Sequence, residues 1–148
     1  MRTSPCPPAA PRRAPADRAE RQGCAVLLLD THAALWLLAG DERLSASARA
    51  FCAQRERGRR RSAVTIWEVQ IKRTLGRLRA PRAPHHALCR DGVLPLPITD
   101  EHALRIGELP PLHRHPFERM LVAQALVEGA AIVSADRRLA AYGVEAPW

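Results

Sequence analysis

The sequence predicts an α/β fold of three layers, in which a central, mostly parallel sheet is flanked by helices. Short apolar runs alternate with longer helix-like segments along most of the chain, and this alternation is typical of parallel sheets. A length of 148 residues and a hydrophobic content of 47% are sufficient for one domain with its own core. We therefore expect one folded domain over residues 25–148.

The predicted strands are short aliphatic runs bounded by polar or turn-forming residues. The first run ends at Asp30, and a similar run near the end of the chain is followed by Asp136. The expected strands are 25–29, 61–64, 94–98 and 130–134, with a last extended piece at 144–147.

The predicted helices begin and end at residues suited to those positions. Ser45 can cap the second helix, and Pro116 fits a first helical position. Gly40, Gly76 and Gly129 each follow a helical run, where a left-handed residue commonly ends a helix. The expected helices are 32–39, 46–57, 65–76, 84–90, 100–107, 116–128 and a short one at 136–142.

Residues 1–24 differ from the rest of the chain because they are rich in proline and arginine and lack apolar periodicity. This composition predicts a disordered extension, and a mis-assigned translation start is a second explanation. The apolar run that begins at Ala25 is interrupted by Asp30 and His32, so it is too short for a signal peptide or a membrane span. We expect a cytoplasmic protein.

The chain is basic, with a formal net charge of +8. Ten Lys and Arg residues but only two acids, Glu56 and Glu68, lie between Arg55 and Arg82. Such a cluster favours binding to a polyanion such as nucleic acid, and the alternative is an ordinary solvated charge run. The four cysteines show no paired C-x-x-C spacing, so the sequence gives no zinc or redox signal.

Four acidic residues, Asp30, Glu68, Glu118 and Asp136, occur after strand-like runs or in strand-to-helix turns. Because ligands gather at the carboxyl ends of parallel strands, these side chains can converge although they are distant in the sequence. Adjacent carboxylates repel one another unless a cation lies between them, and Mg²⁺ and Mn²⁺ prefer oxygen ligands. The pattern therefore predicts a divalent-metal site.

Each acid also has a purely structural explanation. Thr65-Ile66-Trp67-Glu68 has the pattern of a capping box, and Asp30 and Asp136 can cap the helices that follow them. Glu118 lies in a first helical turn, where its charge complements the helix dipole. Four separate caps do not explain why both strand ends carry an aspartate.

The order and the residue identities of these motifs resemble those of the PIN-domain ribonucleases, in particular the VapC-type toxins of type II toxin–antitoxin systems. The segments that carry the resemblance are Leu27-Leu28-Leu29-Asp30-Thr31-His32-Ala33, the run from Ser62 to Glu68, the run from Pro116 to Ala125, and Val133-Ser134-Ala135-Asp136. The resemblance covers residues 25–148 and leaves the amino-terminal extension unmatched.

The resemblance implies a metal-dependent endoribonuclease in which Asp30, Glu68, Glu118 and Asp136 hold Mg²⁺ or Mn²⁺ and cleave RNA phosphodiester bonds. Ser134 stands where the family usually has a threonine hydroxyl near the metal. The implied partners are an RNA substrate and an antitoxin protein, and the implied assembly is a homodimer.

The chain departs from the family pattern at two positions. The usual D-P-F-D-R stretch reads His115-Pro116-Phe117-Glu118-Arg119 here, so the third acid is one methylene longer and a histidine replaces an aspartate. Catalytic groups tolerate only about half an ångström of displacement, so a catalytically impaired module that binds protein or RNA is the alternative function.

Three histidines near the predicted site are interpreted as non-ligands. His32 is expected only to begin a helix, and His113 and His115 are expected to be exposed loop residues. The alternative for this last pair is a metal-binding role that favours Mn²⁺ over Mg²⁺.

Two families of similar topology fit less well. A haloacid-dehalogenase-like enzyme would carry a second aspartate at position 32, which is His32, and a receiver domain would carry a late lysine, whereas Lys72 is the only lysine of the chain.

Overall fold

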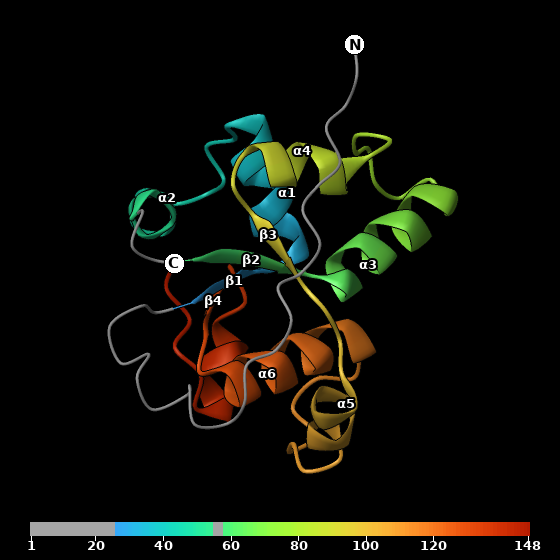
Figure 1. Cartoon of the computed structure of the whole chain (residues 1–148), viewed down its shortest axis with the longest axis vertical. Coiled ribbons are helices and arrows are strands. Elements are labelled where there is room, and N and C mark those ends of the chain that lie inside the picture. The colour runs from blue at the N-terminus through green and yellow to red at the C-terminus, as the bar shows by residue number, and fades with distance from the viewer. Residues whose placement is uncertain (1–25, 55–57) are drawn as a thin grey trace.

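The computed structural model describes residues 26–54 and 58–148, which form one four-stranded sheet with helices on both sides (Figure 1). The strands are β1 (Leu27–Leu29), β2 (Arg59–Ser62), β3 (Leu94–Leu96) and β4 (Ala131–Val133). They lie in the order β3-β2-β1-β4, and every neighbouring pair is parallel. The predicted α/β fold with a parallel central sheet is therefore confirmed.

Seven helices are assigned within the described residues. They are α1 (Thr31–Ala39), α2 (Ala46–Ala53), α3 (Ala63–Thr74), α4 (Pro84–Arg90), α5 (Asp100–Ile106), α6 (Pro116–Glu128) and the short 3₁₀ helix η2 (Arg137–Tyr142). Within the part of the chain that the structure describes, no helix is long and apolar enough to cross a membrane.

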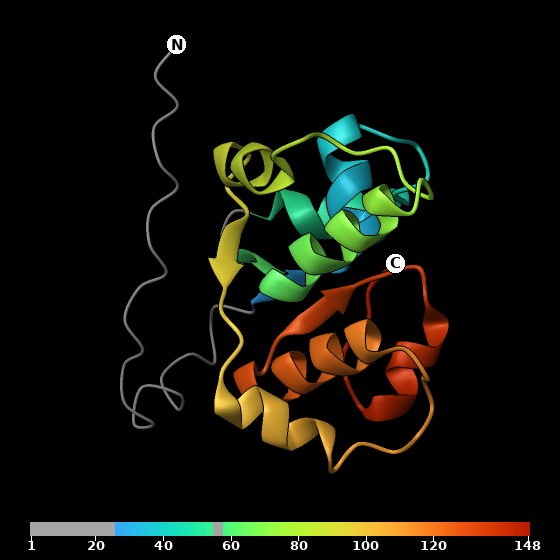
Figure 2. The same ribbon diagram turned by 90° about the vertical axis from the view of Figure 1, so that its right-hand side faces the viewer.

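The sheet separates two apolar cores, one on each face (Figure 2). Leu28 and Ile132 point to the face covered by α6 and η2, where they meet Val122 and Leu139. Leu27, Leu29 and Val133 point to the opposite face and pack against residues of α1, α2 and α4. Alternate residues of a strand face opposite sides, so these continuous apolar runs suit a sheet that is buried on both faces. Helix α3 contacts both α1 and α6, which places it between the two layers.

Most of the predicted helix signals are confirmed, among them the caps at Asp30 and Asp136 and the left-handed glycines Gly40 and Gly129, and one is wrong. Ser45 caps α2 by accepting a hydrogen bond from the N–H of Ala48, and Pro116 opens α6. Helix α3 begins at Ala63, where Ser62 acts as the cap and accepts from the N–H of Val64. The predicted capping box of Thr65 and Glu68 is therefore absent, because the helix starts at Ala63, two residues earlier than expected.

The remaining differences concern element ends. Strand β2 covers Arg59–Ser62 instead of 61–64, and α2 ends at Ala53 instead of residue 57. The extended piece expected at 144–147 is not assigned as a strand. It still lies beside β4, because the N–H of Ile132 donates to the carbonyl of Glu145 at 2.8 Å.

The basic cluster between residues 55 and 82 is only partly a solvated surface. Arg59 pairs with Asp91, and Arg73 donates to the carbonyls of Pro81 and Arg82. Arg61 is buried in the interior strand β2. Several of these cations therefore have structural roles. Residues 55–57, which belong to the same cluster, and the predicted disordered extension over residues 1–24 lie outside the described residues.

Candidate metal centre

Three of the four predicted acids line one pocket at the carboxyl ends of β1 and β4. Asp30 follows β1, Asp136 lies just beyond β4, and Glu118 is in the first turn of α6. The pocket has a volume of about 330 Å³. Its lining residues are Asp30, His32, Trp36, Glu118, Leu121, Ser134, Ala135, Asp136 and Leu139. The expected convergence of strand-end carboxylates is therefore present for these three residues.

Asp30 is held in place by the helix that it caps. Its Oδ1 accepts a hydrogen bond from the N–H of Ala33 at 2.6 Å, and the hydroxyl of Ser134 also bonds to this carboxylate. Burial raises the pKa of the Asp30 carboxyl, against the lowering effect of these hydrogen bonds. A carboxylate that is costly to ionise in this pocket gains from a nearby cation.

Ser134 contacts the carboxylate of Asp30 and the backbone of Asp136. Its Oγ accepts from the backbone N–H of Asp136 at 3.1 Å, which leaves its own proton for Asp30. The residue is 3% exposed, so this bridge is shielded from water. Ser134 therefore links the Asp30 side chain to the backbone of Asp136.

Glu68 lies beside this group but does not line the pocket. It is buried in the second turn of α3, where its Oε2 accepts from the hydroxyl of Thr31. Its Oε1 lies 2.5 Å from Nζ of Lys72, one helical turn further along. Thr31 directly follows Asp30, and the charge of Glu68 contributes to raising the pKa of Asp30. Glu68 is therefore close to the site, although its charge is already neutralised by the protein.

Glu118 has an oxygen atom without a partner. Its Oε2 is sealed from solvent and accepts no hydrogen bond within the described residues. A buried carboxylate oxygen in this condition is strongly unfavourable unless a donor or a cation compensates it. A positive group in the pocket would compensate this oxygen.

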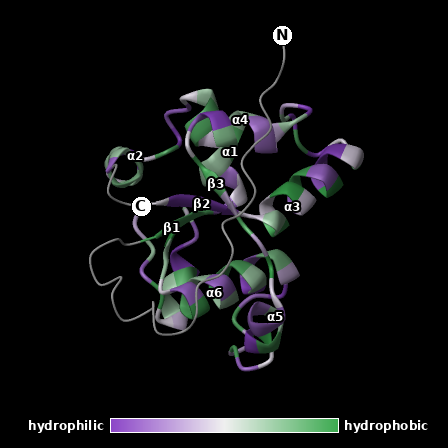
Figure 3. Cartoon of the chain, in the orientation of Figure 1, coloured by the Kyte–Doolittle hydropathy of each residue, from purple (hydrophilic) through white to green (hydrophobic). Residues whose placement is uncertain are grey.

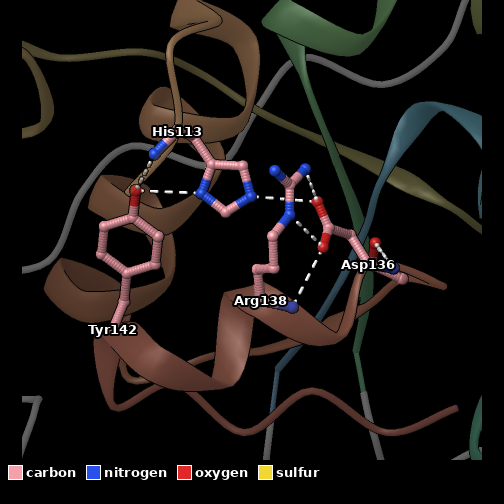
Figure 4. A network of polar contacts seen from close by, with 5 residues as sticks. His113, Asp136, Arg138 and Tyr142 are labelled. Carbon is pink, nitrogen blue, oxygen red and sulfur yellow. Dashed lines mark hydrogen bonds and ion pairs between the residues drawn. The ribbon is translucent and has the colours of Figure 1, made fainter. Parts of the chain in front are cut away.

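Asp136 lies at the centre of a polar network (Figure 4). It caps η2, and both of its carboxylate oxygens accept from the guanidinium of Arg138. Oδ2 also lies 2.9 Å from Nε2 of His113. The hydrogen bonds from Arg138 and His113 hold the pKa of Asp136 well below its usual range.

The prediction that His113 is an exposed loop residue is wrong, whereas His115 is exposed as expected. His113 is 5% exposed, and its Nδ1 lies 2.9 Å from the hydroxyl of Tyr142. Because the Asp136 carboxylate can only accept, Nε2 of a neutral His113 carries the proton. The Tyr142 hydroxyl then donates to Nδ1 while it accepts from the backbone N–H of His113 at 3.0 Å.

Arg119 explains how His113 reaches this position. Its guanidinium donates to the carbonyls of Ile106, Leu109 and Pro110, at distances of 2.8 to 3.1 Å. These bonds tie the loop after α5 to the first turn of α6. Loop contacts of this kind have no sequence periodicity, so the sequence does not indicate the hydrogen bonds that Arg119 and His113 form here.

The donor set suits a hard divalent cation, but it is not assembled as a coordination shell. Within residues 26–54 and 58–148, no three His, Cys, Asp or Glu side chains are grouped closely enough to hold a metal ion. Lys72 binds Glu68 and Arg138 binds Asp136, so two carboxylates are directed toward internal cations. The oxygen ligands of Asp30, Glu118 and Asp136 nevertheless fit Mg²⁺ or Mn²⁺ in chemical type, and the orphan oxygen of Glu118 fits a positive charge.

Comparison with known proteins gives a family and a structural neighbour. The family model of the PIN domain matches residues 27–145. The crystal structure of VapBC2 from Rickettsia felis, bound to a DNA fragment from their promoter, has a similar fold with a TM-score of 0.56. That match covers 82% of this chain and 96% of the other at 11% sequence identity, so it concerns the fold alone. No curated protein matches the chain.

Proposed function

The chain belongs to the PIN domain family, and from this premise we propose that it is a Mg²⁺- or Mn²⁺-dependent endoribonuclease of the VapC type. The observation that carries the proposal is the sealed, unpartnered Oε2 of Glu118 in a pocket that it shares with Asp30 and Asp136. A fold tolerates such an atom where a cation is to be bound.

Each carboxylate has a distinct part in the proposed site. Asp30, Glu118 and Asp136 would hold the cation from the pocket, and Glu68 would add a fourth charge from the Thr31 side. Ser134 would keep Asp30 and Asp136 at a fixed separation. A bound divalent cation would stabilise negative charge on the phosphodiester and assist activation of the attacking water.

The internal cations have a second role in this proposal. Lys72 and Arg138 neutralise Glu68 and Asp136 when no metal is bound, which limits the repulsion among four carboxylates. The Arg138 side chain is largely exposed, at 69%, so it can move away from Asp136 with a small loss of free energy. Binding of the divalent cation would then replace the Arg138 guanidinium as the partner of Asp136.

The substrate and partners follow from the resemblance and are supported by the charge of the chain. A net charge of +8 favours a polyanionic substrate such as RNA. We propose an antitoxin protein as the partner and a homodimer as the assembly. The structural neighbour is a VapBC complex, which supports a toxin–antitoxin pair for this chain.

The nuclease function is tested by incubating the purified full chain with single-stranded RNA while Mg²⁺ or Mn²⁺ is titrated. Cleavage should require the cation, stop in EDTA and disappear in Asp30→Asn. Cleavage that persists unchanged in Asp30→Asn would show that the activity belongs to a contaminant or to another site.

The alternative function is a catalytically impaired PIN module that binds protein or RNA. It is favoured by the absence, among the described residues, of three side chains grouped to hold a metal ion. RNA binding without cleavage at any cation concentration would support this alternative.

A further inference from the structure

A buried arginine in the interior strand β2 forms no ion pair within the part of the chain that the structure describes. Arg61 is 7% exposed, and its Nε is sealed from solvent without a hydrogen-bond acceptor in the described residues. Figure 3 shows β2 as a hydrophilic strand beside the apolar β1. Because an unpaired buried charge is among the costliest features of a fold, this arginine needs a compensating anion.

The other arginines of the strand differ from Arg61. Arg59 forms an ion pair with Asp91 at 3.3 Å, and Arg60 is only partly buried at the edge of another pocket. Burial lowers the pKa of the Arg61 guanidinium, as expected for a cation removed from water without a carboxylate nearby. Among the three arginines of this strand, Arg61 is therefore the one that combines burial with the lack of an ion pair within the described residues.

Two histidines of α4, His85 and His86, lie on the same side of the sheet as Arg61. Arg61 is aligned with Leu29 of β1, and aligned residues of parallel strands point to the same face. Leu29 packs in the core cluster that includes Leu88 of α4, so Arg61 lies on the α4 side. Burial, the neighbouring His86 and the charge of Arg61 all lower the pKa of His85, and the two imidazole rings are 4.1 Å apart. We call Arg61, His85 and His86 the Arg61 cluster.

We propose that the Arg61 cluster binds a phosphate of the RNA backbone at a position separate from the scissile bond. The proposal rests on the proposed function and adds a second contact point for the substrate. Arg61 directly precedes Ser62, the cap of the helix that carries Glu68, so the cluster and the carboxylates lie at the same edge of the sheet. A guanidinium fits a phosphate through paired hydrogen bonds, and imidazole N–H groups can add further donors.

The test is fluorescence-anisotropy titration of the full chain with a labelled single-stranded RNA in EDTA, where no metal-dependent cleavage interferes. Arg61→Met should weaken RNA binding by about tenfold, which corresponds to the loss of one charge-assisted phosphate contact, and lower the salt slope by about one. The same variant should unfold at a higher temperature without RNA, because it removes an uncompensated buried charge. Arg60→Met is the matched control, since it removes the same charge from the same strand on the opposite face.

Two further measurements distinguish an RNA phosphate from a protein partner as the ligand of the Arg61 cluster. His85→Gln, a change at a less buried position, should weaken RNA binding severalfold even if Arg61→Met folds poorly. Inorganic phosphate should raise the melting temperature of the wild type more than that of Arg61→Met, which identifies the phosphate group itself as the ligand. A tight Arg61-dependent complex with an acidic peptide, together with RNA binding that is indifferent to Arg61, would assign the cluster to a protein partner and overturn the proposal.

Equal losses of RNA affinity in Arg60→Met and Arg61→Met would show that the effect arises from net charge alone. This result would also overturn the proposal. Because the readout is binding without metal, a chain that cleaves no RNA can still pass this test. Failure here would likewise leave the nuclease proposal standing.

Discussion

His113 and Asp136 form a partly buried hydrogen bond between two loops that are distant in the sequence, with 2.9 Å between Nε2 and Oδ2. The Tyr142 hydroxyl fixes the other ring nitrogen, and the imidazole stacks on the tyrosine ring with centroids 5.4 Å apart. This arrangement orients a carboxylate of the proposed metal site through a partner that does not itself line the pocket.

Replacing His113 should therefore weaken metal binding without removing a proposed ligand. Loss of such an orienting partner typically costs about 10- to 100-fold in metal affinity or activity, so His113→Ala should show a loss in that range. His113→Gln should retain much of the affinity, because its amide can donate near the position of Nε2. Calorimetric titration with Mn²⁺ measures both variants, and equal affinities for His113→Ala and the wild type would exclude an orienting role.

Substitutions of Glu118 test whether the extra methylene of glutamate lowers the rate of RNA cleavage. If the longer side chain misplaces the third ligand, Glu118→Asp should raise the rate of metal-dependent RNA cleavage, whereas Glu118→Gln should abolish it. A displacement of one carbon–carbon bond exceeds the tolerance of about 0.5 Å expected for catalytic groups, so an increase of roughly tenfold is reasonable. A lower rate in Glu118→Asp would mean that the surrounding pocket has adapted to glutamate.

Replacing Lys72 tests whether this internal cation competes with the metal ion for Glu68. Lys72→Met leaves the buried Glu68 carboxylate with only the Thr31 hydroxyl, so the metal-free protein should melt at a lower temperature. Saturating Mn²⁺ should then restore more stability to the variant than to the wild type. Thermal unfolding with and without Mn²⁺ measures this difference, with Lys72→Arg as the control that keeps the charge. Identical Mn²⁺-induced shifts in Lys72→Met and the wild type would rule out competition.

The two strand-end aspartates should affect stability in opposite directions. A raised pKa means that ionised Asp30 opposes folding above the usual aspartate range, near 3.8, so Asp30→Asn should stabilise the metal-free chain at pH 7 while keeping the helix cap. A lowered pKa means that Asp136 contributes stability at pH 7 that is lost as the pH falls below about 3.8.

Asp136→Asn should therefore destabilise the chain at pH 7, by no more than about 1 kcal/mol because its ion pair with Arg138 is partly exposed. Melting temperatures in EDTA from pH 3 to pH 8 measure both effects. The same sign of change in both variants at pH 7 would contradict this electrostatic account.

The fold was largely predictable because β1 and β4 are apolar on both faces and its helices have local start and stop signals. The resemblance to the PIN family is confirmed by the family match. The helix start at Ser62 was missed because Ser62 and Thr65 are both good capping residues, and the end of β2 decides between them. A strand of consecutive arginines gives little local indication of where it ends.

The site was predictable only where it depends on strand ends. Asp30 and Asp136 follow aliphatic runs, so their proximity could be inferred from the parallel topology. His113 reaches Asp136 through a tertiary contact that carries no periodicity. Arg138 is only two residues from Asp136, but no motif in the sequence indicates their pairing. The pairing of Glu68 with Lys72 was visible as an i, i+4 spacing, but the sequence did not show that this carboxylate would be buried.

Isothermal titration calorimetry of the full chain with Mn²⁺, compared with Asp30→Asn and Asp136→Asn, tests the central claim most directly. We expect saturable binding by the wild type that weakens at least tenfold in each variant, because each change removes a charged ligand from the same pocket. Binding of equal strength in all three proteins, or no binding by the wild type, would contradict the assignment of this carboxylate group as a metal centre.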